Sequence, residues 1–291
     1  MSDHATAFKP SLRLFDATMI VAGSMIGSGI FIVSTDIVRN VGSAGWLIAV
    51  WIITGIMTVM AAVSYGEMSG MFPKAGGQYV YLKEAFSPLA GFLYGWSSFT
   101  VIQTATIAAV AVAFSRFTAY LIPEVGENVI LFSIGFLKIS AAQILAILLI
   151  LFLTYTNTKG IKGGKIIQTT FTTVKLLSIF GLIILGFLLV KHNFWNENWA
   201  TGMNAMQLEK DAGGFLKNGN WFPITGTVLI GAIAASMVGS LFSSDAWNNV
   251  TFIAGEIENP KRNIGLSLFL GTMIVCTIYV VVNLMYLYVL P

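Results

Sequence analysis

The sequence predicts an all-α polytopic membrane protein with seven hydrophobic spans. Of its 291 residues, 56% are hydrophobic and only 10% are charged, whereas soluble domains carry about 25% charged residues. A net charge of +3 is too small to indicate a nucleic acid partner. Segments long enough to cross a bilayer lie near residues 15–35, 45–67, 88–121, 140–156, 166–190, 223–254 and 264–290.

The first span is interrupted by three glycines and two serines between Gly23 and Gly29. Each glycine destabilises a helix interior by about 1 kcal/mol relative to alanine. Irregular backbone inside a membrane persists only beside protein or a water-filled cavity. An unwound segment would present free N–H groups and a helix dipole end to a small anion, as in discontinuous transporter helices. Close helix packing through Gly23-x-x-x-Gly27 is the alternative.

Residues 71–87 are too polar to span the membrane. Pro73 and Gly76 open this segment, and its aromatic residues alternate with Lys83 and Glu84. The pattern predicts a short cytoplasmic interfacial helix, with an ordinary loop as the alternative.

The basic residues predict a cytoplasmic N-terminus, because positive charge concentrates in cytoplasmic loops. With seven spans, nine basic residues fall on the N-terminal side: Lys9, Arg13, Lys74, Lys83, Lys159, Lys162, Lys165, Lys261 and Arg262. Five fall on the other side: Arg39, Lys138, Lys191, Lys210 and Lys217. The polar segment 191–222 would then be extracellular.

Lys175 lies about a third of the way into the fifth span. Charged groups inside a membrane are costly and mark functional hypotheses. Thr172, Thr173 and Ser178 give the same span a polar face that could line a cavity. A buried cation there suits proton coupling or a fixed-charge role, and snorkelling of the side chain towards the cytoplasm is the alternative.

The sixth span repeats the pattern of the first. Its residues Val238 to Asp245 carry a Gly/Ser-rich interruption like that at Ala22 to Gly29. Two interrupted spans in corresponding positions predict an inverted repeat with a binding site at its interface. We therefore expect residues 1–190 to form a first five-helix repeat, 191–222 a loop, and 223–291 the start of a second repeat. Asp245 would help recognise a substrate ammonium or cap the second half of the span.

The remaining chemistry-bearing residues indicate neither an enzyme nor a metal site. Cys276 is the only cysteine and lies in an apolar run, and the two histidines form no cluster. The sequence shows no nucleophile–base pair, no phosphate loop and no channel selectivity segment. We expect no catalytic residue, no metal and no cofactor.

Three segments together carry a family resemblance. Gly23 to Phe31 resembles the first-helix signature of the amino acid–polyamine–organocation (APC) superfamily. Phe242 to Asn248, followed by Gly255 to Asn263, is similar to the L-amino acid transporter (LAT) branch, and Lys175 in its Thr-Thr-Val-Lys-Leu-Leu context fits that branch too. The resemblance extends along essentially the whole chain.

This resemblance implies a LeuT-type fold of five plus five helices, with the first and sixth helices discontinuous. The substrate carboxylate would meet the amides around Gly27, and its ammonium would meet backbone carbonyls of both interruptions. Phe242 would be an aromatic gate. The implied substrate-binding residues are Met25, Ile26, Gly27, Ser28, Gly29, Phe242, Ser243, Asp245, Trp247 and Asn248.

Lys175 would occupy the place that sodium takes in sodium-coupled relatives of the family. That implies sodium-independent amino acid transport, usually exchange, in a plasma (inner) membrane. Neutral amino acids are the expected substrates, and Asp245 leaves room for cationic ones. The heavy-chain cysteine of animal LAT proteins is missing, so no disulfide-linked heavy chain is expected.

The chain ends at Pro291, after the seventh span. Against the family pattern, we expect helices eight to ten to be missing. The alternative function is therefore a truncated, non-transporting fragment, or an assembly partner, that binds amino acid weakly or not at all.

Overall fold

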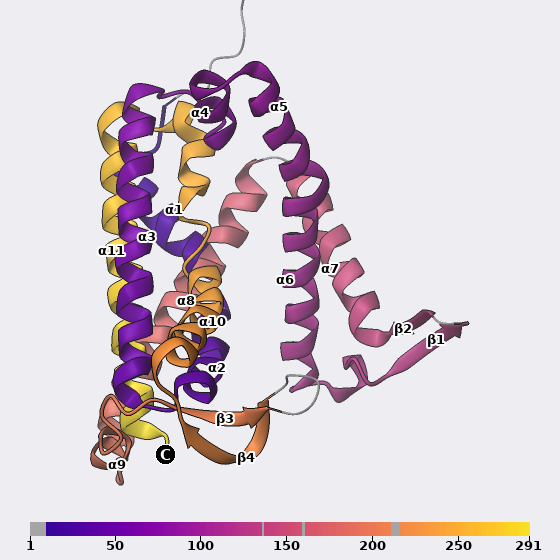
Figure 1. Ribbon diagram of the computed structural model, residues 1–291. Coiled ribbons are helices and arrows are strands. Elements are labelled where there is room, and N and C mark those ends of the chain that lie inside the picture. Colours follow the sequence, from indigo (N-terminus) through magenta and orange to yellow (C-terminus); the bar gives the residue numbers. More distant parts are fainter. Residues whose placement is uncertain (1–9, 136, 159–160, 211–215) are drawn as a thin grey trace, which may run out of the picture. The chain divides into compact units, whose positions relative to one another are not determined.

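The computed structural model describes residues 10–135, 137–158, 161–210 and 216–291 (Figure 1). They form two parts, which we describe separately: the residues up to Tyr81 together with Lys175–Pro291, and Leu82–Val174. Among the described residues, six helical segments are long and apolar enough to cross a membrane, and a bent pair at the start makes a seventh. The predicted polytopic helical architecture is confirmed. Lys9 and Lys159, used above for orientation, lie outside the described residues.

The first span is a broken helix. Helix α1 (Leu14–Met25) stops at Met25, and three residues separate it from α2 (Gly29–Val41). The two helices are bent by 48° at this break. Helix α2 ends at Gly42, whose φ of 53° is the left-handed conformation in which glycine commonly terminates helices. The glycine-rich interruption therefore unwinds the span as predicted.

The second broken span is built from α10 (Gly226–Ser243) and the 3-10 helix η3 (Trp247–Glu256). The chain between them turns at Ala246, a non-glycine residue with φ of 68°. Such a conformation costs roughly 1–3 kcal/mol and persists where the surroundings impose it. This break overlaps only the end of the interruption predicted at Val238 to Asp245, because α10 stays helical through Ser243.

The core of this part is organised by α11 (Pro260–Val289), which packs along α3 (Ala44–Met71) and α1, while α10 packs along α2 (Figure 1). Glycines permit the closest approach: a Cβ on Gly66 would lie 3.0 Å from the Cα atom of Gly265. Trp51 and Tyr279 are fully buried between these helices, with ring centroids 5.2 Å apart. Rigid packing of α3, α11 and α1 holds the first break in place.

The predicted interfacial helix is present but shorter than residues 71–87. Helix α4 spans Gln78–Ala85 and follows a turn in which Gly77 has a φ of 51°. Tyr81 is buried beside Tyr65, and that burial raises the pKa of Tyr81 to about 12. The same Tyr65 ring packs edge-on against Trp247, with the ring centroids 5.0 Å apart. An aromatic cluster thereby connects the start of α4 to the start of η3.

Residues 191–222 contain structure that composition did not predict. Short helix α9 (Trp195–Trp199) follows α8 (Ile161–Leu189), and β3 (Met206–Lys210) pairs antiparallel with β4 (Leu216–Pro223). The side-chain amide of Asn198 donates to the carbonyl oxygens of Leu287 and Leu290 at 2.9 and 2.7 Å. The segment is thus tied to the end of α11.

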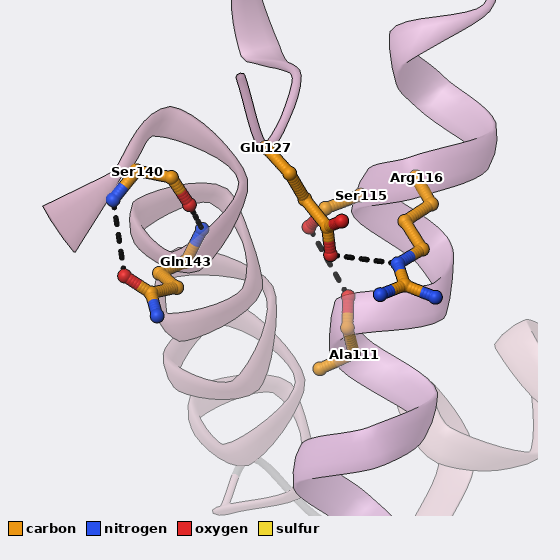
Figure 2. A network of polar contacts seen from close by, with 6 residues as sticks. All are labelled: Ala111, Ser115, Arg116, Glu127, Ser140 and Gln143. Carbon is orange, nitrogen blue, oxygen red and sulfur yellow. Dashed lines mark hydrogen bonds and ion pairs between the residues drawn. The ribbon is translucent and has the colours of Figure 1, made fainter. Parts of the chain in front are cut away.

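The second part contains a helical hairpin and one β-hairpin. Its elements are α5 (Pro88–Ser97), the π-helix η1 (Ser98–Ile102), α6 (Gln103–Ala119), η2 (Pro123–Val125), β1 (Ile130–Ile134), β2 (Leu137–Ser140) and α7 (Ala141–Thr158). Figure 2 shows a reciprocal cap, in which the Ser140 amide donates to Gln143 and the Gln143 amide donates to the Ser140 hydroxyl. Arg116 pairs with Glu127 at 2.6 Å, which connects the end of α6 to the loop that follows (Figure 2).

Candidate functional site

The two breaks meet in the interior of the first part. Gly29, the first residue of α2, lies so close to Ser243, the last residue of α10, that a Cβ on Gly29 would overlap the Ser243 side chain. The phenol hydroxyl of Tyr279 lies within hydrogen-bonding distance of the carbonyl oxygens of both Met25 and Ser243, at 3.1 and 3.0 Å. Segments more than two hundred residues apart therefore share one site.

The first break combines buried and open backbone. Met25 and Ile26 are buried, whereas Gly27 and Ser28 are exposed. A Cβ built on Gly27 would have no heavy atom of the described residues within 4 Å, apart from its neighbours in the chain. Helix packing, the alternative explanation of the Gly23-x-x-x-Gly27 spacing, leaves Gly27 unexplained because the side of Gly27 that a Cβ would occupy faces open space among the described residues.

Lys175 reaches from α8 into the first break. Its ammonium donates to the carbonyl oxygens of Ile26 and Gly23, at 2.8 and 3.0 Å. These carbonyls belong to the last turn of α1 and the residue after it, where helix oxygens lack partners within the helix and the dipole is negative. The structure therefore favours the fixed-charge interpretation of Lys175 over snorkelling away from the protein.

The second break leaves two side chains open. Phe242 is 68% exposed, and Asp245 is exposed as well. The Asp245 amide donates to the Phe242 carbonyl at 3.3 Å. The residue that precedes η3 in the cap position is Ala246, and η3 has no side-chain cap. The alternative assignment of Asp245 as a helix cap is therefore wrong, which leaves its carboxylate available for another partner.

Trp247 and Asn248, expected to shape the side-chain pocket, lie at the start of η3 and are half-buried. The Trp247 ring packs against Tyr65, while the Asn248 carbonyl accepts from the Thr251 hydroxyl at 2.7 Å. Both residues are thus fixed at one side of the second break.

A buried pair of hydroxyl groups connects α10 to α3 one turn before the second break. The hydroxyl oxygens of Thr54 and Ser240 lie 2.7 Å apart, and both residues are fully buried. One turn further, the Ser243 hydroxyl donates to the Gly239 carbonyl at 2.9 Å. The end of α10 is therefore held by polar contacts on α3 and within its own last turns.

Tyr279 is the site residue that sequence reasoning missed. It occupies an apolar run in which an aromatic residue is most simply explained by packing. The signal that could have found it is the phenol group, because a tyrosine hydroxyl buried in a span needs a hydrogen-bond partner.

A cavity of about 740 Å³ lies on the same part, beside α2 and the strand pair. Phe31, Arg39, Glu197, Trp221 and Tyr286 are among its lining residues. None of the residues of the two breaks, nor Tyr279, lines this cavity, so it is distinct from the site.

The two breaks offer complementary charges to a small zwitterion. The first amides of a helix lack partners within it, so the start of α2 favours an anion such as a carboxylate, although the Phe31 amide donates to the Ser28 carbonyl at 3.1 Å. The terminal carbonyls of α1 and α10 favour a cation such as an ammonium. The fold and these breaks together define a multi-pass membrane protein of the discontinuous-helix class, with a candidate site for a small ligand.

Comparison with known families agrees with this class. The amino acid permease family model matches residues 12–291, and the chain belongs to that family, whose fold is LeuT-like.

The similar proteins include mouse large neutral amino acids transporter small subunit 2, which is 31% identical over 281 residues (96% of this chain and 48% of the relative). Human b(0,+)-type amino acid transporter 1 is 27% identical over 284 residues, which are 97% of this chain and 52% of the relative. Mouse Asc-type amino acid transporter 1 is 28% identical over 280 residues (96% and 48%). These relatives are transporters rather than enzymes, and the chain spans about half their length.

Proposed function

We propose that this chain carries the substrate site of a sodium-independent amino acid exchanger that works by alternating access. The observation that carries the proposal is the meeting of the two breaks at the Tyr279 hydroxyl. Two opposed helix ends, one rich in amides and one in carbonyls, fit the carboxylate and ammonium that all amino acids share. The names of the relatives, all amino acid transporters, support the same ligand class.

In this proposal the carboxylate binds the amides of Gly27, Ser28 and Gly29. The open space at Gly27 supports this placement, because the ligand needs room beside the backbone. Phe242 closes over the bound amino acid, and its exposure supports such a role. Asp245 favours an ammonium, either that of the backbone or that of a cationic side chain.

The proposed independence of sodium rests on Lys175. Its ammonium already supplies a positive charge to the carbonyls of Gly23 and Ile26. A metal cation at the same oxygens would be repelled by that charge and would lose its ligands. Lys175 therefore substitutes for a coupling ion, and neutral amino acids are the preferred substrates.

The proposed setting is a plasma (inner) membrane with the N-terminus on the cytoplasmic side, as the distribution of basic residues predicts. No disulfide-linked partner is expected, because Cys276 is buried. The bilayer itself contacts the exposed apolar side chains of the spanning helices.

A second candidate function is amino acid binding without transport. The meeting of the two breaks at Tyr279 supports it equally, since binding needs this site alone, whereas transport also needs the site to open to the other side of the membrane.

Reconstituted liposomes distinguish these functions. Radiolabelled leucine, alanine and arginine uptake would be measured with and without internal amino acid, in sodium and in choline. Uptake that is stimulated by internal amino acid and equal in both salts supports the exchanger. Sodium-dependent uptake contradicts the role of Lys175, and saturable binding without uptake supports the second candidate.

A further inference from the structure

Tyr279 lies where no substrate-binding residue was expected, yet it is the only described side chain shown to touch both breaks by hydrogen bonds. Its hydroxyl oxygen is 3.1 Å from the Met25 carbonyl and 3.0 Å from the Ser243 carbonyl. Met25 is the last residue of α1, and Ser243 is the last residue of α10. Both carbonyls are therefore helix-terminal oxygens without a partner in the following turn.

The surroundings hold the Tyr279 ring rigidly. Tyr279 is 1% exposed, and its ring meets the Trp51 ring edge-on at an interplanar angle of 70°. The backbone carbonyl of Tyr279 accepts from the side-chain amide of Asn283 at 2.8 Å. The phenol oxygen is thus a fixed point on α11, a helix packed against both α1 and α3.

The two carbonyl acceptors at this point outnumber the single hydroxyl donor. A phenol has a single O–H donor, while two carbonyl oxygens converge on it. The hydroxyl can give one well-formed hydrogen bond at a time, so the second carbonyl is under-satisfied. An ammonium has three N–H donors and no acceptor, and it would supply the missing donor. Because both oxygens lie about 3 Å from one atom, they are at most about 6 Å apart. An ammonium beside the phenol reaches both oxygens when their separation is below that limit.

We propose that Tyr279 is a positioning residue of the site, whose hydroxyl joins the ends of α1 and α10 and aims their terminal carbonyls at the substrate ammonium. The recognition of an ammonium rests on the proposed function, whereas the joining of the two helix ends does not. Movement of either helix end away from Tyr279 frees the hydroxyl for the other, so the phenol remains bonded while one break opens.

The variant Tyr279→Phe tests this inference, because it removes the hydroxyl and keeps the ring that packs on Trp51. Tyr286→Phe is the matched control, since Tyr286 lies on the same helix and lines the cavity instead. Hydrogen exchange would be followed by mass spectrometry in peptides covering residues 25–30 and 243–248. We expect Tyr279→Phe to speed exchange in both segments by about tenfold, the equivalent of one lost hydrogen bond. Unchanged exchange in either segment would overturn the joining role.

Leucine affinity provides the second readout. We expect Tyr279→Phe to weaken leucine binding about tenfold, with a melting temperature close to that of Tyr286→Phe. Unaltered affinity, with both segments exchanging faster, would overturn the ammonium-aiming role. If unmodified protein binds no leucine, the proposed function fails, while the exchange data still decide whether Tyr279 joins the helix ends.

If Tyr279→Phe does not fold, a measurement on the unmodified protein tests whether the substrate ammonium binds at both breaks. Leucine and 4-methylpentanoate, which lacks the amino group, would be compared for their protection against exchange. We expect leucine to protect both segments, and 4-methylpentanoate to protect only residues 25–30, where the carboxylate binds. Equal protection of both segments by the two compounds would contradict the inference.

Discussion

The ammonium of Lys175 and the carbonyl oxygen of Ile26 lie 2.8 Å apart, although the residues are separated by 149 positions. This contact places a fixed positive charge at the break in the first span. A charged donor strengthens such a hydrogen bond about twofold relative to a neutral one. The contact therefore both holds α1 to α8 and sets the electrostatics of the break.

Lys175→Met tests that role. Removing the ammonium leaves the carbonyls of Gly23 and Ile26 without their donor, so we expect leucine exchange to fall at least about tenfold. Lys191→Met is the control, because Lys191 is an exposed lysine just after the same helix. This variant should exchange leucine at the rate of the unmodified protein. Exchange by Lys175→Met that stays intact and becomes dependent on sodium would show that the site is cation-coupled.

Gly29→Ala tests the close approach of the two breaks. Its new Cβ would overlap Ser243, and overpacking of this kind costs about 1–3 kcal/mol. We expect a lower melting temperature, partly restored in the double variant Gly29→Ala, Ser243→Gly, which removes the opposing side chain. An unchanged melting temperature of Gly29→Ala would mean that α2 and α10 are further apart than described.

Asp245→Asn tests recognition of positive charge at the second break. The substitution keeps the shape and removes the charge of an exposed side chain, so the effect on affinity should be modest, about two- to fivefold. We expect arginine to lose affinity relative to leucine in competition binding. Asp36→Asn on α2 is the control. An unchanged ranking of the two amino acids would remove Asp245 from the site.

Phe242→Ala tests the gate. Because Phe242 is 68% exposed, its removal should change the melting temperature little. We expect faster release of bound leucine and weaker exchange, measured by dilution of radiolabelled complex. Phe180→Ala, an exposed phenylalanine on α8, should release leucine at the normal rate. Equal release rates in the two variants would contradict a gating role for Phe242.

Much of the fold could be predicted because the signals are local. Glycine and serine inside an apolar span weaken a helix at that place. The first predicted interruption contains the observed break, whereas the second break, residues 244–246, overlaps only the end of the predicted Val238 to Asp245. The charge of Lys175 marked it for attention for an equally local reason, the cost of placing an ammonium in a membrane.

The features that sequence could not predict depend on tertiary placement. Tyr279 joins the two breaks only because α11 brings its hydroxyl to carbonyls 254 and 36 positions away. Asp245 resembled a helix cap by spacing, but the left-handed turn at Ala246 moved the start of η3. The β3–β4 pair lies in a segment whose asparagine and glycine content is typical of loops.

The central claim, that the two breaks form one amino acid site, is tested most directly by equilibrium binding of radiolabelled leucine to the purified chain in sodium-free buffer. Gly27→Val would be compared with Gly231→Val. In the part of the chain that the structure describes, a Cβ at either glycine meets no atom within 4 Å beyond its local backbone, and of the two only Gly27 lies in a break. We predict saturable binding by the unmodified chain and by Gly231→Val, and loss of binding by a folded Gly27→Val. Equal binding by the two variants, or no saturable binding by the unmodified chain, would contradict the claim.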